Sequence, residues 1–352
     1  MKNPFWNKRE HRLRAGWRIS LGFVALFVLM QAGSALLPAL IALGLWVSGK
    51  LPPEPSIEVL TDGVNQVLFS SIPLIILQGV LSAAALVLAI ALAGRLFDRR
   101  RFADFGFHVN RRWWADFGFG LALGAVPMAF IFAAELAAGW VTVSGLYRYY
   151  SAVFWAPMVV GMFTFIGVGV YEEVITRGFL LRNLAEGFHF GRISARKALL
   201  IAYLGSSAVF GLLHLGNPNS SWISTINLII AGLFLGLGFV LTGELAIPIG
   251  LHITWNYFQG YVFGFPVSGG VTGASLFQTQ QGGPDLWTGG AFGPEAGLIG
   301  LIAILIGSVL TVAWVRWQHG RAGLDENLAI YTPVTPEPEQ TAQANSRNDA
   351  LE

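Results

Sequence analysis

The chain has 352 residues, of which 54% are hydrophobic and only 12% are charged, and its mean hydropathy is +0.59. Roughly 25% of the residues of a soluble globular domain are charged, so this composition excludes a soluble domain and predicts an integral membrane protein. The absence of cysteine excludes disulfides, thiolate metal sites and a cysteine nucleophile, and a net charge of +2 gives no support to nucleic-acid binding.

Runs of about 20 apolar residues predict membrane-spanning helices. We expect an all-α polytopic helix bundle with about eight spans, at about 17–47, 66–95, 115–140, 154–184, 197–216, 221–242, 246–263 and 296–317. A cleavable signal peptide is the competing interpretation of the first run, because Ala32-Gly33-Ser34-Ala35 resembles a cleavage site. The apolar sequence continues to Trp46, which favours a retained span.

The distribution of Lys and Arg predicts the orientation of the bundle. Arginines cluster in the connections after the second, fourth and eighth spans, whereas the loops of the opposite side hold only Lys50 and Arg148. No Lys or Arg occurs from Ala198 through Val315. Both termini are therefore predicted to be cytoplasmic, and we expect the chain in a bacterial cytoplasmic (inner) membrane.

The membrane domain, residues 17–317, is expected to have two flanking segments. The basic arm, residues 1–16, is predicted to rest on anionic lipid, and residues 318–352 are predicted to be a disordered polar cytoplasmic tail. Within the domain, the Gly-rich segment 263–297 could be an external loop, a lid or a partly re-entrant segment. No internal repeat is evident, so an inverted-repeat transporter gains no support.

Two adjacent glutamates and an arginine, Glu172, Glu173 and Arg177, occur in the fourth apolar run. Charges cost a few kcal/mol in hydrocarbon, so they are retained there when paired and functional. Glu173 and Arg177 are four residues apart with the acid first, the favourable order for a helical ion pair. Glu172 has no such partner, and an apolar setting suits a general base. A charge cluster at the membrane interface is the structural alternative.

Two histidines occur in strongly apolar sequence, and each shares a helix face with a second residue four positions away. Phe210 precedes His214, so its ring is expected to pack beside and orient the imidazole. Asn256 follows His252, and its amide could orient the histidine or donate to an oxyanion. Three separate spans thus bring polar groups into apolar sequence, which predicts a reaction centre within the bundle.

The depth of these residues sets a condition on that prediction. Glu172 is expected near the cytoplasmic end of its span, whereas His214 comes roughly 25 Å into the next span. The groups meet only if the fourth span tilts to place Glu172 deeper, or if the fifth begins as an interfacial helix.

Metal chemistry is left open by the residue types. Glu172, His214 and His252 match the His₂Glu ligand set of catalytic zinc sites, although no His-Glu-x-x-His pair is present. Without a metal, Glu172 would activate water while the histidines and Asn256 stabilise the oxyanion. No Gly-x-Ser-x-Gly elbow and no Gly-x-Gly-Asp motif occurs, which disfavours serine and aspartyl chemistry.

The three motifs resemble those of the CPBP family of intramembrane proteases, also called the CAAX protease and bacteriocin-processing family or the ABI family, which includes the Ras-converting CAAX prenyl endopeptidase. They are Glu-Glu-x-x-x-Arg from Glu172, Phe-x-x-x-His from Phe210 and His-x-x-x-Asn from His252, within about 154–263. The resemblance implies that Glu172 is the general base, supported by Glu173 and Arg177. It also implies that His214, His252 and Asn256 bind the water or a metal and stabilise the oxyanion.

The function expected from this resemblance is hydrolysis of peptide bonds in membrane-associated peptides or proteins by a glutamate-activated water. A binding or bacteriocin-immunity protein on the same scaffold is the alternative, and a proton-coupled transporter is the third. The family points to C-terminally prenylated substrates in eukaryotes, but the sequence specifies neither the natural substrate nor the oligomeric state.

Overall fold

The computed structural model describes residues 3–149 and 155–333, and this part of the chain is mostly helical. Its α-helices are α1 (Ala15–Val47), α2 (Ile57–Phe69), α3 (Ile72–Ala93), α4 (Arg111–Ala137), α5 (Trp155–Glu173), α6 (Arg182–Phe188), α7 (Ala195–Leu213), α8 (Trp222–Thr242), α9 (Ala246–Tyr257), α10 (Asp285–Thr288) and α11 (Leu298–His319). Within the described residues, seven helical stretches are long and apolar enough to cross a membrane, namely Ala15–Val47, Ile72–Asp98, Arg111–Ala137, Trp155–Phe188, Ala195–Leu213, Trp222–Thr242 and Leu298–His319. The chain is therefore an integral membrane protein.

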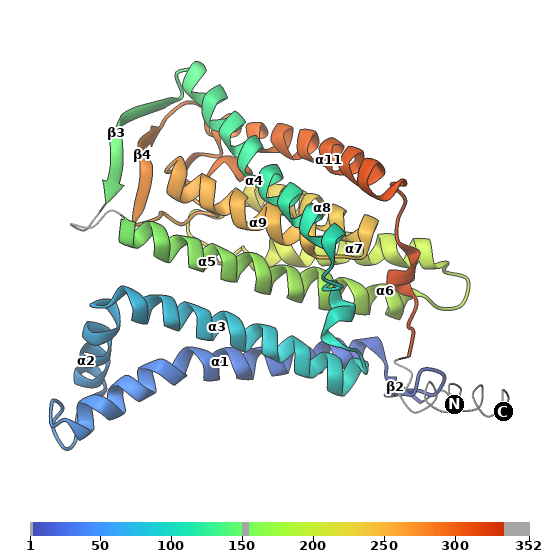
Figure 1. Cartoon of the computed structure of the whole chain (residues 1–352), viewed down its shortest axis with the longest axis horizontal. Helices are drawn as coiled ribbons and strands as arrows, with labels where there is room; N and C mark the ends of the chain where they lie inside the picture. The colour runs from blue at the N-terminus through green and yellow to red at the C-terminus, as the bar shows by residue number, and fades with distance from the viewer. Residues whose placement is uncertain (1–2, 150–154, 334–352) are drawn as a thin grey trace, which may run out of the picture.

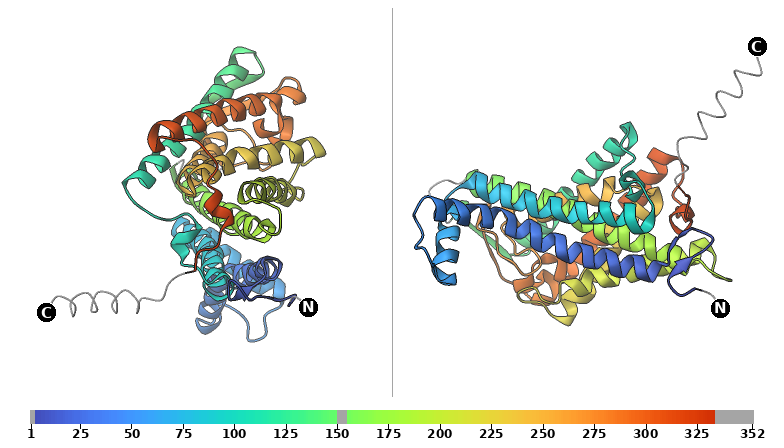
Figure 2. Two further views of the ribbon diagram at one scale, coloured as in Figure 1. Left: turned by 90° about the vertical axis from the view of Figure 1, so that its right-hand side faces the viewer. Right: turned by 90° about the horizontal axis from the view of Figure 1, so that it is seen from below.

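The helices form two groups that lie against each other (Figures 1 and 2). In one group α1 packs on α3, with the short α2 beside their connection, and in the other α4 to α9 pack with α11. Helix α3 contacts α5 and so joins the two groups. The second group contains all three sequence motifs.

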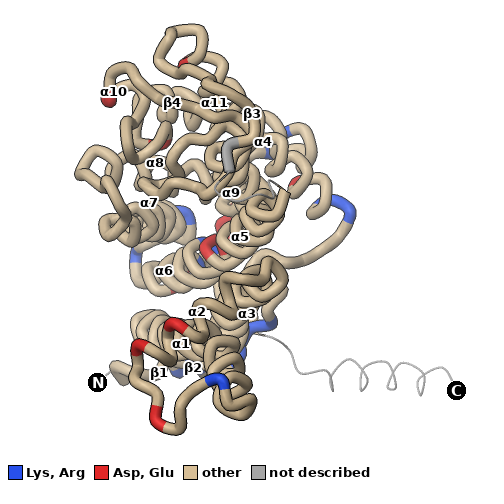
Figure 3. Tube along the Cα trace, turned by 90° about the vertical axis from the view of Figure 1, so that its left-hand side faces the viewer, with Lys and Arg blue, Asp and Glu red and all other residues tan. Residues whose placement is uncertain are grey.

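The two ends of the bundle differ in what they carry. The N-terminal strands β1 (Trp6–Asn7) and β2 (Arg12–Leu13), helix α6 and the short helix η7 (Glu326–Ala329) lie at one end, which we call the arm end (Figure 1). At the other end, the sheet end, β3 (Val141–Tyr149) pairs antiparallel with β4 (Ala274–Gln281). Seen from the sheet end, the loops over α8, α10 and β4 are almost free of Lys and Arg (Figure 3).

The Gly-rich segment 263–297 folds as part of the sheet end. It supplies β4 and α10, and a bulge between Val143 and Gly145 interrupts the register of β3 with β4. Its first loop is tied to the turn after α7, because the side-chain amide of Asn217 donates to the carbonyl oxygen of Ser268 at 3.0 Å. The segment is therefore an ordered part of the bundle in the described structure.

The sequence-based prediction of about eight spans differs from the structure at two places. The second predicted span, 66–95, is divided at Ser70 and Ser71 into the end of α2 and the start of α3. The predicted span 246–263 is the 12-residue α9, extended by a π-helical turn over Phe258–Val262, and it is too short to count among the seven. Helix α9 still runs from the arm end toward the sheet end, which brings both chain ends to the arm end (Figure 1).

Close packing of α9 on α4 depends on glycines. A Cβ at Gly120 would lie 2.5 Å from the carbonyl oxygen of Ile247, and a Cβ at Gly250 would lie 2.5 Å from that of Phe117. Small residues let helix backbones approach closely in this way in membrane bundles. The hydroxyl of Thr254 then reaches α4 and donates to the carbonyl oxygen of Leu121 at 2.7 Å. These contacts fix the helix that carries His252 and Asn256.

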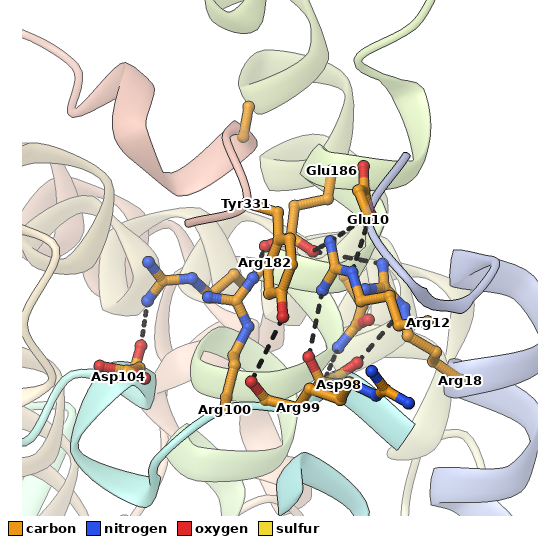
Figure 4. Close-up of polar contacts among 12 residues, drawn as sticks. Glu10, Arg12, Arg18, Asp98, Arg99, Arg100, Asp104, Arg182, Glu186 and Tyr331 are labelled. Carbon is orange, nitrogen blue, oxygen red and sulfur yellow. Dashed lines mark hydrogen bonds and ion pairs between the residues drawn. The ribbon is translucent and has the colours of Figure 1, made fainter. Parts of the chain in front are cut away.

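The basic arm does not simply lie on lipid, as the sequence predicts, because its Arg12 is buried in an ionic cluster together with Arg18 of α1 (Figure 4). Nη2 of Arg12 lies 2.7 Å from Oε2 of Glu186, and Nε of Arg18 lies 3.3 Å from Oδ1 of Asp98. Arg100 also pairs with Glu186. Burial lowers the pKa of Arg12, while the attraction of Glu10 opposes that shift.

Part of the predicted polar tail is packed against the arm end. Leu328 and Ala329 of η7 are buried against α6 and α7, and the Arg12 guanidinium lies 3.4 Å from the centre of the Tyr331 ring. The ordered chain thus extends past the expected boundary at residue 318. The remainder of the predicted tail, residues 334–352, lies outside the described residues.

Candidate active site

The two glutamates occupy the last turn of α5, where the helix widens. The π-helical segment Val174–Leu181 begins directly after Glu173 and carries Arg177. Such wide turns are uncommon and occur frequently at functional sites, because the extra residue per turn redirects the side chains around it. The continuous helical stretch from Trp155 to Phe188 therefore has its irregular turn close to its middle.

This position resolves the depth condition set by the sequence. Glu172 lies about 16 residues before the end of its helical stretch at Phe188, or roughly 24 Å at 1.5 Å per residue. His214 follows α7, which starts at Ala195, and so lies roughly 28 Å from the same end of the bundle. The two residues are at matching depths because the fourth span continues past the predicted end at 184. Neither a tilt nor an interfacial start is required.

Arg177 is fully buried and has several partners. Its Nη1 donates to Oε1 of Glu173 at 3.0 Å and to the hydroxyl of Thr176 at 2.8 Å, and its Nη2 donates to the carbonyl oxygen of Gly232 at 2.7 Å. Its guanidinium also lies 4.6 Å from the centre of the Phe210 ring. The pair predicted from the four-residue spacing is therefore present, and it ties α5 to α7 and α8.

Glu173 connects this arginine to a histidine. Its Oε1 lies 2.8 Å from Nδ1 of His252, and an ionised carboxylate can only accept hydrogen bonds. The contact therefore places a proton on Nδ1 and directs Nε2 away from Glu173. The spacing of His252 and Asn256 suggested that the asparagine could orient the histidine, but the structure gives that contact to Glu173.

Glu172 has a different environment from its neighbour. Its side chain is 22% exposed while that of Glu173 is 0% exposed, and its Oε2 lies 3.9 Å from Nε2 of His252. This distance is too long for a hydrogen bond and short enough for one water molecule to contact both atoms. The two adjacent carboxylates thus differ in partners and in access.

The second histidine is held by the residue one turn before it. Nδ1 of His214 lies 2.7 Å from the carbonyl oxygen of Phe210, which also places its proton on Nδ1. The Phe210 ring packs beside the His214 ring at a centroid distance of 4.8 Å, as the spacing predicts, and its edge approaches the ring of His252 at 6.1 Å. One aromatic ring therefore supports both imidazoles.

The three motifs meet at one cavity of about 410 Å³ between α5, α7, α8, α9 and α11. Glu172, His214, His252 and Asn256 line it, while Glu173 and Arg177 lie behind its wall. Most of the remaining lining is apolar, including Leu228, Phe234, Leu251 and Trp255. The structure thus brings together five of the predicted residues at the cavity, these four and Phe210, and keeps two as buried support.

Comparison with known protein families identifies the segment that supplies most of the residues lining this cavity. Residues 154–258 match the family model described as type II CAAX prenyl endopeptidase Rce1-like. The match confirms the resemblance to the CPBP family drawn from the motifs, and it spans α5 to α9 with every predicted site residue. The rest of the chain lies outside it, and no curated protein and no solved structure matches the chain.

A metal site was an open alternative for this Rce1-like segment. Both histidines line the cavity, but among residues 3–149 and 155–333 no group of three His, Cys, Asp or Glu is placed to hold a metal ion. The arrangement of Glu172, His214 and His252 therefore does not fit a His₂Glu site as it stands. The chemistry we propose for these residues involves no step through a metal.

The sequence did not single out three polar residues at the cavity, Asn217, Ser268 and Glu295. Glu295 accepts hydrogen bonds from the hydroxyl of Ser268 at 2.9 Å, from its backbone N–H at 2.5 Å and from the side chain of Gln259. Burial raises the pKa of Glu295, and these donors oppose that shift. The sequence offered one signal for Glu295: it follows Pro294 at the end of the Gly-rich segment, directly before the last predicted span.

Proposed function

We propose that the chain is an intramembrane endopeptidase that hydrolyses peptide bonds of membrane-associated peptides or proteins with a water activated by Glu172. The observation that carries the proposal is the double contact of Glu173 with Arg177 and His252 beside an accessible Glu172. This arrangement supplies a base, an oriented imidazole and a cavity for a substrate segment. The Rce1-like match supports the protease class.

The reaction can be written from the groups at the cavity. One water proton passes to the Glu172 carboxylate, while Nε2 of His252 accepts a hydrogen bond from the other. The water oxygen attacks the scissile carbonyl carbon, and the side-chain amide of Asn256 donates to the oxyanion that forms. Glu172 then gives its proton to the leaving nitrogen as the carbon–nitrogen bond breaks. The products are a new carboxylic acid, which keeps the second proton of the water molecule, and a new amine. Transfer of that proton from the acid to the amine gives a carboxylate and an ammonium group.

We further propose that the arm end is cytoplasmic. The basic connections after α3 and α6 and the basic residues at the end of α11 all belong to that end, as does the arm itself (Figure 1). Such an excess of Lys and Arg is typical of cytoplasmic loops. Both described ends of the chain would then face the cytoplasm of a bacterium, with the chain in its inner membrane.

Mass spectrometry of membrane-protein termini tests the proposal, in host cells that carry either the wild-type chain or Glu172→Gln. We expect new termini near membrane segments only with the wild type, and these would also identify the substrates. Identical termini in both cells, with both proteins folded and equally abundant, would contradict the proposal and favour a binding or immunity role.

A further inference from the structure

The ionisable groups at the cavity are acids, imidazoles and a phenol. Among the described residues that line it, these groups are Glu172, Glu295, His214, His252 and Tyr171, with no Lys or Arg. The sequence explains this, because no Lys or Arg occurs from Ala198 through Val315, a stretch that contains α8, α9, β4 and the loop before α11. The loops over α8, α10 and β4, which are almost free of Lys and Arg in Figure 3, belong to the same stretch.

The nearest cation on the catalytic helix does not reach the cavity. Arg177 has no exposed surface, and its guanidinium already donates to Glu173, Thr176 and Gly232. The Phe210 ring covers it at 4.6 Å. Because the side chain of Arg177 is 0% exposed, a ligand carboxylate in the cavity has no accessible atom of this arginine to pair with.

Glu295, in the short helix before α11, makes its part of the cavity wall unsuitable for an anion. Its oxygens face Ser268 and Gln259, so the donors of those side chains are already occupied. Whether ionised or protonated, Glu295 brings no positive charge to the wall. The neutral donors that remain at the cavity are few, and its surface is mainly apolar.

We propose that this cavity accepts a peptide bond in the interior of a polypeptide, flanked by neutral or basic residues, and disfavours a bond beside a free C-terminal carboxylate. This inference rests on the protease function proposed above. A carboxylate near the scissile bond would be taken from water into an apolar cavity without a cation, next to the charge of Glu172. Substrate selection would therefore differ from that of family members that act on C-terminally prenylated proteins.

The same charge distribution acts on the product. Hydrolysis creates a carboxylate on the carbonyl side of the broken bond, directly beside Glu172. Because no described Lys or Arg lines the cavity to hold it, this end leaves readily. An interior cut releases two polypeptide fragments, and neither is retained by an ion pair.

Paired peptides test the inference with the full chain in neutral phosphatidylcholine vesicles. Short peptides of Ala, Leu, Val and Phe are made in identical sequences that end either in a carboxylate or in an amide, and cleavage is followed by mass spectrometry. For bonds within three residues of the C-terminus, we expect the amides to be cut at least about tenfold faster, mainly through KM, as expected for an unpaired charge in an apolar site. Faster cleavage of the acids would overturn the inference.

A substitution at the cavity provides a matched control. Asn217 lines the cavity and donates to the carbonyl oxygen of Ser268, a bond that a lysine ammonium could also make. Asn217→Lys is expected to reduce the preference for amides by about tenfold, whereas Asn217→Gln, which adds no charge, should leave it unchanged. An unchanged preference in Asn217→Lys would show that cavity charge does not set it.

The failure of this inference can be distinguished from failure of the protease proposal. Cleavage of either peptide supports a protease, and only the ratio between acid and amide tests the charge argument. If neither is cut, anisotropy of fluorescently labelled peptides measures their binding to the wild-type chain. Tighter binding of the acid would then contradict the inference independently of catalysis.

Discussion

At the residue scale, the site depends on two adjacent glutamates that have different surroundings. Successive residues on a helix point about 100° apart, and the wide turn that begins after Glu173 redirects the side chains of that turn further. Glu173 faces the interior, where Arg177 and His252 contact the same oxygen, whereas Glu172 faces the cavity. The pair therefore suits a division between a supporting carboxylate and a reacting one.

Replacing each glutamate separately tests this division. Glu172→Gln should abolish turnover and leave thermal stability nearly unchanged, because its side chain is partly exposed and its contact with His252 is as long as 3.9 Å. Glu173→Gln should lower turnover and also cost roughly 3 kcal/mol of stability, because Arg177 would keep a buried charge without its partner. Peptide cleavage and thermal unfolding in detergent measure both effects.

The exposed Glu58 of α2 offers a matched control for these substitutions, since Glu58→Gln changes charge far from the cavity. It should alter neither property by more than about 0.5 kcal/mol. Equal losses of activity in Glu172→Gln and Glu173→Gln, with unchanged stability in both, would contradict the division of labour.

At the element scale, α9 is the helix whose placement the site requires most. It carries His252 and Asn256, lies against α4, α5 and α8, and is almost entirely buried. Hydropathy indicates that such a segment is apolar but cannot show whether lipid or other helices surround it. The motif residues on α9 could therefore be predicted, whereas its short length and enclosure depend on packing partners distant in sequence.

Glycine substitutions in α4 test the placement of α9. A Cβ at Gly124 would lie 2.6 Å from the backbone nitrogen of Trp255, so Gly124→Ala should displace α9, cost about 1–3 kcal/mol and strongly reduce turnover. At Gly118 of the same helix, an added Cβ meets no atom within 4 Å. Gly118→Ala should therefore retain both stability and activity in the same unfolding and cleavage assays. Tolerance of both substitutions would show that α4 does not position α9.

The loop that closes the cavity provides a second test at this scale. Glu295 joins Gln259, in the π-helical turn that follows α9, to Ser268 of the loop. Glu295→Gln replaces one carboxylate acceptor by an amide and should loosen the loop. The double variant Glu295→Gln, Gln259→Glu again pairs one amide with one carboxylate, and should partly restore the attachment of the loop. The chain has no native cysteine, so Val267→Cys in each background reports cavity access by its rate of thiol labelling.

We expect labelling to accelerate several-fold in Glu295→Gln and to slow again in the double variant. KM for peptide should change more than kcat, because Glu295 contacts no reacting group. Unchanged labelling in Glu295→Gln would show that this hydrogen-bond network does not hold the loop.

At the scale of the whole molecule, the arm end joins segments from both chain ends to the centre of the sequence. Arg12 pairs with Glu186 and contacts the Tyr331 ring, so three distant parts of the chain meet at one side chain. The sequence shows that the arm is basic. It does not show whether its arginines pair with lipid phosphates or with buried carboxylates of the same chain. Only the folded structure distinguishes them. The same limitation applies to the tail. Its low average hydropathy predicts disorder, although the few apolar residues of η7 are buried against the bundle.

Two truncations of the C-terminal region test whether this closure stabilises the bundle. A chain that ends at Gly323 loses the buried Leu328 and Ala329 together with the Tyr331 ring over Arg12, and should be less stable by about 3 kcal/mol or more. A chain that ends at Pro333 keeps these contacts and should unfold within about 0.5 kcal/mol of the wild type. Thermal unfolding in detergent compares the two, and terminal proteolysis of residues 3–14 reports whether the arm is released.

Since the cavity lies far along the bundle from η7, the shorter chain should keep its kcat at temperatures where it remains folded. Equal stability of the two truncated chains would mean that the contacts of η7 and Tyr331 do not support the fold, and that the ionic cluster alone holds the arm.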